Sequence, residues 1–261
     1  MPRALHTAAT GMMAQQLRID VIAHNLSNVN TTGFKRSRLE FQDLLYQTLK
    51  LGGVGTTRQT EAPAGLQIGH GTRPVATERN FSSGDLQNTE NQLDVAIEGR
   101  GFLQVRLPSG ELVYTRDGAL KLDSQGQLVT SDGYPIEPPI VVPIDTLQIN
   151  IGSDGLVTAT TSQRGQTTEL GNIFLSHILN PGVLEAMGRN LYRMSTEAGE
   201  TIVARPGEEG LGTLAQGFLE SSNVRVVEEM IAMIVGQRAY EANSKVIQTA
   251  DRMLEDANRL R

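Results

Sequence analysis

Residues 224–260 read VRVVEEMIAMIVGQRAYEANSKVIQTADRMLEDANRL, and this stretch decides the fold. Apolar or aromatic side chains recur along it every seven residues, the spacing of a helix that buries one face against a partner helix. The members of this series are Val226, Met233, Tyr240, Ile247 and Leu254. Asn223 can cap the start of the helix, and Arg259 lies near its end, where the helix dipole favours a cation. We therefore predict one helix of about 38 residues within 222–261. Such a helix is about 57 Å long, too long to be covered by one compact domain.

The first thirty residues repeat the seven-residue pattern. Leu5, Met12, Ile19 and Leu26 form the main series, and Ile22 and Val29 belong to a second series three positions behind it. Taken alone, such a stripe is more often the core face of a helix in a monomer than an assembly surface. Gly33 follows a run of asparagines and can adopt the left-handed conformation that ends a helix, so we expect this helix to end near Asn30.

Between the predicted helices the sequence changes to turn signals at intervals of about eight residues. The turn pairs are Ser109-Gly110, Asp117-Gly118, Gln125-Gly126 and Asp132-Gly133. Short runs of strand-forming residues separate them, such as residues 102–107 and 112–115. This spacing is typical of short antiparallel strands joined by hairpins. We predict a β-rich domain over residues 76–204.

The remaining residues connect the helices with the β-rich domain, and we assign 34–75 and 205–221 to this connecting segment. Within it, residues 51–65 are rich in Gly and Thr and show neither period, so we expect a long loop or an extended arm. The predicted fold class is α+β, with a central domain of short antiparallel strands. Residues 1–33 and 222–261 form a discontinuous helical domain that pairs as a coiled coil.

Composition excludes several classes of partner. The formal net charge is −6, so no overall positive field attracts nucleic acid. The densest basic run, Lys35, Arg36 and Arg38, adjoins Glu40, and we interpret it as a solvated surface stretch, with an anion-binding or membrane-surface site as the alternative. No run of about 18 apolar residues occurs, so we expect no membrane insertion. The first residues lack the apolar core of a cleaved signal peptide, which predicts a cytoplasmic protein unless export needs no cleaved signal.

The sequence contains no recognisable catalytic or metal-binding motif. It has no cysteine, which excludes disulfides, zinc thiolates and a cysteine nucleophile. The four histidines, His6, His24, His70 and His177, lack partners at metal-ligand spacing. Gly99-Arg100-Gly101 leads into a predicted strand rather than a helix, so we interpret it as a tight turn rather than a phosphate site. We predict a protein that is not an enzyme and has no catalytic residues, no metal and no cofactor.

Several longer motifs resemble the signatures of the bacterial flagellar rod and hook protein family. Residues 23–35 read AHNLSNVNTTGFK and resemble the N-terminal signature, while residues 217–224, GFLESSNV, and 237–245, QRAYEANSK, resemble the C-terminal one. Residues 94–102, DVAIEGRGF, and 114–118, YTRDG, resemble the opening of the family's β domain. The residues that carry the signatures are Asn25, Asn28, Thr31, Gly33, Phe34, Asn223, Gln237, Arg238, Tyr240 and Asn243.

The resemblance implies that both terminal helices pair into a coiled-coil inner domain that lines a channel, with the β domain outside. It also implies export by the flagellar export apparatus without a cleaved signal peptide. The expected location is the basal body, crossing the periplasm to the outer membrane, and the expected partners are copies of the chain, proximal rod and hook proteins and the surrounding basal-body rings. Within the family the sequence is most similar to distal rod subunits, with hook and proximal rod subunits as alternatives.

Two hypotheses of different classes remain. The favoured one is a self-assembling structural subunit without a substrate, because apolar stripes at both chain ends are most economically buried against each other and against further copies. The other is a secreted binding module that oligomerises through its helices and holds a carbohydrate or surface partner on its β domain. Under the first hypothesis, the assembly interface consists of Leu5, Met12, Ile19, Ile22, Leu26, Val29, Val226, Met233, Tyr240, Ile247 and Leu254.

Overall fold

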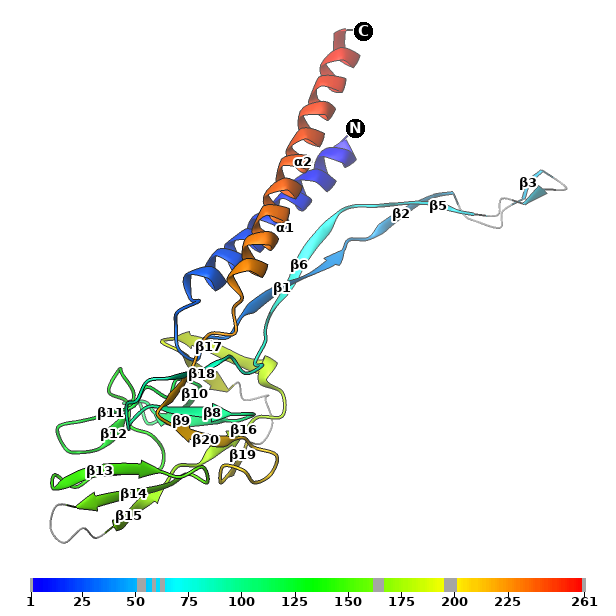
Figure 1. Cartoon of the computed structure of the whole chain (residues 1–261). Coiled ribbons are helices and arrows are strands. Elements are labelled where there is room, and N and C mark those ends of the chain that lie inside the picture. The colour runs from blue at the N-terminus through cyan, green and yellow to red at the C-terminus, as the bar shows by residue number, and fades with distance from the viewer. Residues whose placement is uncertain are drawn as a thin grey trace. The chain divides into compact units, whose positions relative to one another are not determined.

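The computed structural model describes residues 2–50, 55–57, 60–61, 64–161, 167–194 and 201–259. Figure 1 shows an N-terminal helix, a long series of β-strands and a C-terminal helix, which confirms the predicted α+β class. The chain divides into two compact units. Unit 1 consists of Met1–Leu26, Ser37–Arg79 and Arg225–Arg261, and unit 2 consists of Ser27–Arg36 and Asn80–Val224.

Unit 1 contains both helices and several two-stranded ribbons. Its elements are α1 (Pro2–Ser27), β1 (Ser37–Asp43), β2 (Tyr46–Lys50), β3 (Gly55–Thr57), β4 (Thr60–Glu61), β5 (Leu66–Gly69), β6 (Thr72–Arg79) and α2 (Val226–Arg259). The first turn of α2 carries Glu228 and Glu229 and its last turn carries Arg259, a distribution that the helix dipole favours. Neither α1 nor α2, as far as the structure describes them, combines the length and the continuous apolar character that a membrane crossing requires.

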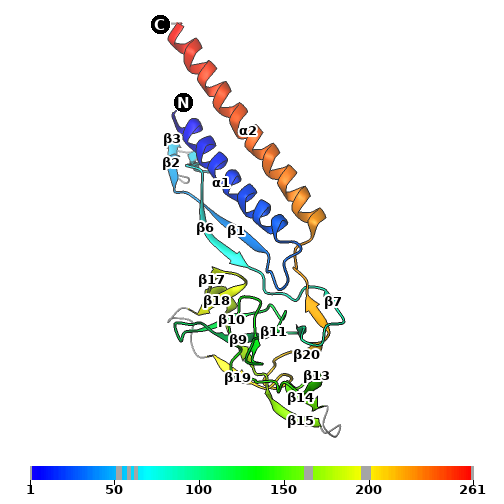
Figure 2. The ribbon, with the colours of Figure 1, turned by 90° about the vertical axis from the view of Figure 1, so that its left-hand side faces the viewer.

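The two helices of unit 1 lie side by side and run antiparallel. A Cβ atom at Gly11 would lie 3.0 Å from the side chain of Asn243, and one at Gly236 would lie 3.2 Å from that of Ile19. Residues further along α1 therefore contact residues nearer the N-terminus of α2. Figures 1 and 2 accordingly show the first turn of α1 and the last turn of α2 at the same end of the pair. The missing side chains of both glycines allow this close approach.

The strands of unit 1 form antiparallel ribbons. β1 pairs with β6, with a register shift between Glu40 and Phe41, and β2 pairs with β5. All side chains of β2 are exposed. The arm expected over residues 51–65 falls largely outside the described residues, which include only the paired backbones of β3 and β4 and residues 64–65 of this segment.

Unit 2 contains the remaining strands and one 3-10 helix. Its elements are β7 (Leu86–Asn88), β8 (Val95–Glu98), β9 (Phe102–Arg106), β10 (Leu112–Thr115), β11 (Lys121–Leu122), β12 (Leu128–Val129), β13 (Thr146–Ile151), β14 (Leu156–Thr161), β15 (Thr167–Asn172), β16 (Leu175–His177), η1 (Pro181–Val183), β17 (Leu184–Gly188), β18 (Leu191–Met194), β19 (Ile202–Ala204), β20 (Thr213–Gln216) and β21 (Phe218–Glu220). A six-stranded antiparallel sheet has the order β17-β18-β10-β9-β16-β19, and β13, β14 and β15 form a second sheet. Because β20 pairs with β8 and β21 pairs with β7, residues 213–220 are part of this unit.

The main hydrophobic core of unit 2 collects side chains from most of its strands. Its fully buried members include Leu103, Leu128, Ile136, Val157, Ile173 and Leu175. Three of the four expected turns are present, and Gly110, Gly126 and Gly133 have positive φ. Asp117-Gly118 does not form a hairpin turn, because β10 pairs with β9 and β18 while β11 pairs with β12. At Gly126 a Cβ atom would collide with the carbonyl of Val142. This turn therefore requires glycine both for its positive φ and for this close backbone contact.

Candidate assembly surfaces and the signature residues

The face of α2 that meets α1 follows a strict seven-residue series. Glu229, Gly236 and Ala250 are the buried residues of α2, and Asn243 lies against Gly11 of α1. All four positions carry small or polar side chains. From the side of α2, this contact therefore buries little apolar side-chain surface.

The predicted interface series on α2 lies beside this contact face rather than on it. Met233, Ile247 and Leu254 are half-buried, whereas Val226 and Tyr240 are exposed to about 40% (40% and 41%). On α1, Ile22 is buried, and the half-buried members of the series are Leu5, Met12, Ile19 and Leu26. Val29 lies beyond the end of α1 in unit 2 and is half-buried.

A second apolar face of α2 points away from α1. Its members are Val227, Met230, Ile231, Ile234 and Val235, each at least half exposed. Ile231 lies about 200° around the helix axis from the buried Glu229, since each residue turns the helix by about 100°. We call these five residues the outward face. It was not among the predicted interface residues, although the run VVEEMIAMIV over 226–235, apolar almost all around the helix, is the pattern that indicates it.

The signature asparagine of α1 holds the chain where it leaves the helix. Asn25 is buried, its Nδ2 donates to Ser37 O (2.8 Å), and its Oδ1 accepts from Ser37 N (3.0 Å). The same Nδ2 also donates to Glu229 Oε2 of α2 (3.3 Å). One amide side chain therefore joins α1, the start of β1 and α2 within unit 1.

A short turn follows α1 in unit 2 and ends the helix earlier than the expected Asn30. Thr31 N donates to Asn28 O (3.2 Å), and Thr31 Oγ1 donates to Asn28 Oδ1 (3.2 Å). Phe34 is buried, and Gly33 has φ +67°. A Cβ atom at Gly33 would lie 2.8 Å from the carbonyl carbon of Arg116, so the signature glycine is required both by its conformation and by close backbone contact.

The C-terminal signature asparagine binds two backbone segments of unit 2. Asn223 Oδ1 accepts from Arg36 N (2.8 Å). Its Nδ2 donates to Asn80 O (2.8 Å) and to Ser82 O (3.1 Å). The other signature residues of the C-terminal segment lie on α2, where Gln237, Arg238 and Tyr240 are exposed and Asn243 is half-buried against Gly11. Some signature residues therefore hold backbone segments together, and others lie on the exposed surface of a helix.

A buried ionic cluster in unit 2 corrects the interpretation of the basic run. Lys35 was expected on a solvated surface, but its side chain is fully buried, and its Nζ contacts Glu220 Oε1 at 2.6 Å and donates to Ser82 O at 2.7 Å. Arg116 Nη1 contacts Glu220 Oε2 at 3.3 Å and is also buried. Burial lowers the pKa of Lys35, Glu220 counteracts this, and Arg116 lowers it further. Spacing along the chain could not reveal this cluster, because Lys35 and Glu220 are separated by 185 positions.

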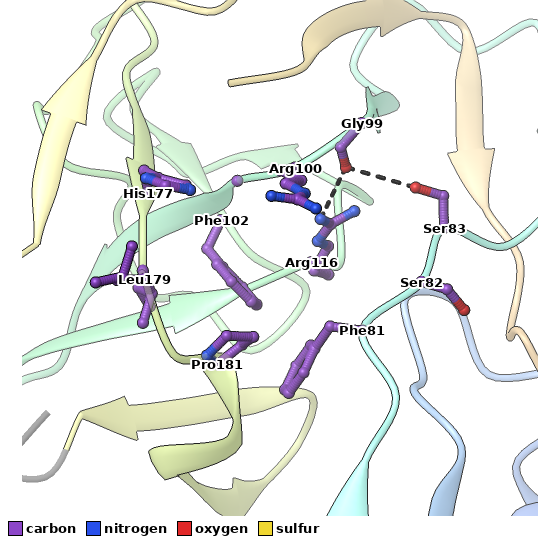
Figure 3. Close-up of a pocket in the computed structure, with 12 residues that line it drawn as sticks. Phe81, Ser82, Ser83, Gly99, Arg100, Phe102, Arg116, His177, Leu179 and Pro181 are labelled. Carbon is purple, nitrogen blue, oxygen red and sulfur yellow. Dashed lines mark hydrogen bonds between the residues drawn. The ribbon is translucent and has the colours of Figure 1, made fainter. Parts of the chain in front are cut away.

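A pocket of about 500 Å³ opens beside this cluster in unit 2 (Figure 3). Its aromatic wall is formed by Phe81 and Phe102, whose rings meet edge to face with centroids 5.4 Å apart. The guanidinium of Arg116 lies 5.3 Å from the centroid of Phe102, and Arg100 and His177 also line the pocket. In all the described ranges, the pocket included, no three His, Asp or Glu side chains gather in an arrangement that could hold a metal ion.

These observations define a class of protein. It is a two-unit α+β protein whose C-terminal helix leaves an apolar face uncovered, while the β-rich unit is held together by its own core.

Comparison with known proteins identifies the family. Residues 5–35 match the model of the flagella basal body rod protein, residues 96–159 match the D1 domain of the flagellar hook protein FlgE/F/G, and residues 215–260 match the C-terminal region of the flagellar basal body rod FlgEFG protein. The flagellar basal-body rod protein FlgG of Borreliella burgdorferi is 51% identical over 100% of this chain and 99% of the relative. The proteins of the same name from Buchnera aphidicola subsp. Schizaphis graminum and Caulobacter vibrioides are 48% and 45% identical, over 98% and 99% of this chain and 99% of each relative.

The chain belongs to the flagellar basal-body rod protein family, whose members are structural, non-enzymatic parts of the flagellum. Membership implies assembly with other rod, hook and basal-body components. The alternative of a secreted binding module is not favoured, because the relatives match along the whole chain and carry the rod-protein name.

Proposed function

We propose that this chain is a subunit of the distal rod, which polymerises through its terminal helices into a stiff hollow helical tube. The tube transmits torque and provides a channel for exported proteins. The observation that carries the proposal is the outward face of α2, with five apolar side chains left at least half exposed on the same helix that contacts α1.

The outward face supplies a physical reason for polymerisation. Fully burying one such side chain stabilises by roughly 1.5–3 kcal/mol, so covering five half-exposed ones supplies several kcal/mol per subunit. In the proposed filament, a different surface of the neighbouring subunit covers this face, and the seam between α1 and α2 stays within each chain. Such a contact between unlike surfaces generates a helical filament when its rotation does not close into a ring.

The proposed inner domain consists of residues 1–33 and 222–261, with the helices of neighbouring subunits packed as a coiled coil around the channel. The predicted series on both helices, from Leu5 to Val29 and from Val226 to Leu254, then lies between helices of different subunits. The β-rich domain, proposed over residues 76–204, lies outside, and residues 34–75 and 205–221 connect the two. The half-exposed state of several of these side chains in the single chain supports this arrangement.

The proposed location is the basal body, where the tube crosses the periplasm to the outer membrane after export by the flagellar apparatus without a cleaved signal peptide. Its neighbours along the axis are proximal rod and hook proteins, and the basal-body rings surround it. The names of the relatives support this placement.

Substitution on the outward face tests the proposal. We expect Ile231→Asp to prevent sedimentable filaments at concentrations where the parent chain forms them, since a carboxylate would be buried without a partner. Gln248→Asp, on an exposed position of the same helix, is the matched control and should assemble normally. Electron microscopy of both pellets would contradict the proposal if Ile231→Asp formed filaments indistinguishable from those of the parent.

A further inference from the structure

The pocket of unit 2 has the chemistry of a site for a carboxylate beside an apolar side chain. Phe81 and Phe102 supply the apolar wall, while Arg100, Arg116 and His177 supply cationic or hydrogen-bonding groups. Of the residues described as lining the pocket, none is acidic. Figure 3 shows Arg100 and Arg116 beside the aromatic pair.

Arg116 is incompletely satisfied within its own unit. Its Nη1 contacts Glu220 and its Nη2 donates to Gly99 O (2.8 Å), but its buried Nε has no hydrogen-bond partner in the described part of the chain. Glu220 is already shared with Lys35, so the cluster carries a surplus of positive charge when Lys35 is protonated. An external carboxylate would offset this surplus.

The same unit presents a protruding turn with complementary chemistry. Thr146 N donates to Pro143 O (3.2 Å), which closes a turn with Ile144 and Asp145 at its tip. Ile144 is fully exposed (101%), and the neighbouring Leu147 is 71% exposed. Asp145 is exposed and has no ion pair in the portion of the chain that the structure describes. The closing hydrogen bond and the fixed φ of Pro143 pre-organise the tip, which lowers the entropy lost on binding.

We propose that the Ile144–Asp145 tip of one subunit inserts into the Phe81–Phe102–Arg116 pocket of a second copy of this chain. Ile144 packs against the aromatic wall, and the Asp145 carboxylate pairs with the exposed guanidinium of Arg100, while the buried Arg116 adds its positive charge from within the pocket wall. The tip and the pocket use different residues of the same unit, so each subunit donates one tip and receives another, and such a contact extends a filament when its rotation does not close into a ring. This contact rests on the proposed self-assembly and adds a β-domain interface to the helical one.

Cysteine pairing tests the contact directly, because the chain has no cysteine of its own. The double variant carries Ile144→Cys and Leu179→Cys, where Leu179 lines the pocket and is 85% exposed. A disulfide forms only when two Cα atoms come within about 4.4–6.8 Å. We expect mild oxidation of the assembled double variant to produce a ladder of covalent oligomers, and each single variant to remain uncrosslinked. Ile144→Cys with Leu112→Cys, an exposed position on β10, is the control pair and should give no ladder.

The outcomes separate the two proposals. Filaments without a covalent ladder would overturn the tip-and-pocket contact while leaving self-assembly intact. Failure of the parent chain to form filaments at any concentration would overturn the proposed function and, with it, this contact.

Charge exchange provides an independent test. We expect Asp145→Arg and Arg100→Glu each to raise the concentration needed for filaments by about tenfold, which corresponds to about 1.4 kcal/mol. Combined in one chain, the two changes should recover most of the loss, because the new charges again attract. Asp132→Arg, the same charge change on another exposed turn, should leave assembly unchanged. Additive loss in the double variant would overturn the contact.

Discussion

Glu220 is the residue on which unit 2 depends most directly for electrostatic balance. Its carboxylate accepts from Lys35, Arg116 and the backbone N–H of Gly84, the last at 2.9 Å. All three charged side chains are almost completely removed from solvent. A buried ion pair contributes little net stability, but removing one partner leaves an unpaired charge that costs several kcal/mol.

This cluster predicts an order of destabilisation. Glu220→Gln leaves two buried cations without an anion and should cost about 3–5 kcal/mol of unfolding free energy. Lys35→Met should cost less, because Arg116 and Glu220 then remain as a one-to-one pair. Urea unfolding of unassembled variants measures both values. A larger loss of unfolding free energy for Lys35→Met than for Glu220→Gln would contradict the inference that the cluster holds surplus positive charge.

Asp117 predicts a pH dependence of stability. Burial raises the pKa of Asp117, while the Ala119 backbone N–H and the Thr32 hydroxyl lower it in part. The folded chain therefore binds this proton more tightly than the unfolded chain, and the resulting stability is lost as the pH rises from 3.8 through the raised pKa. Asp117→Asn lacks this titration, so the Tm of this variant should increase relative to that of the parent chain as the pH is raised through this range. A Tm difference that stayed constant with pH would refute the assignment.

Gly33 and Gly110 provide a matched pair for backbone strain. Both have positive φ, but a Cβ atom would contact the Arg116 backbone only at Gly33 and would have open space at Gly110. Gly110→Ala should cost about 1 kcal/mol from conformation alone, and Gly33→Ala clearly more. Thermal unfolding measures the stability that each variant loses. Equal losses would show that the structure around Gly33 relaxes to accept the methyl group without cost.

At the scale of elements, α1 and α2 are long helices with a weak seam. The buried positions of α2 are Glu229, Gly236 and Ala250, so α2 contributes little apolar side-chain surface to the seam. Helices without sufficient tertiary packing are marginal in water.

The terminal helices should therefore gain order on assembly. In dilute monomer we expect a helix content below that of α1 and α2 together, rising when filaments form, because the outward face then becomes buried. Circular dichroism across the assembly concentration measures the change. Full helix content already present in the dilute monomer would count against this expectation.

At the scale of the whole molecule, each unit is assembled from distant parts of the chain. Unit 1 contains both chain ends, and unit 2 contains the segment Ser27–Arg36 together with Asn80–Val224. The main core of unit 2 contains no helix residue, so this unit does not depend on the helices for its hydrophobic stabilisation.

A chain of residues 27–224, which lacks both helices, tests this division. We expect it to remain monomeric and the strands of unit 2 to unfold cooperatively, because the core of this unit and the Lys35–Glu220 cluster are retained. Analytical ultracentrifugation and thermal unfolding would show this. Filament formation by this chain would mean that the helices are dispensable for assembly, and a molten species would mean that unit 2 requires them.

Local patterns in the sequence were enough to predict the two helices, three of the four turns and the family. A period of seven residues and the φ preference of glycine act over a few neighbouring positions, so they can be read without the fold. The face that α2 buries, the burial of Lys35 and the pocket were decided only by tertiary structure. Lys35 meets Glu220 across 185 positions, and Asn25 meets Glu229 across 204. The physical reason is that burial depends on which distant segments fold together, and a charged residue in a basic run has the same local sequence whether solvent or a carboxylate surrounds it.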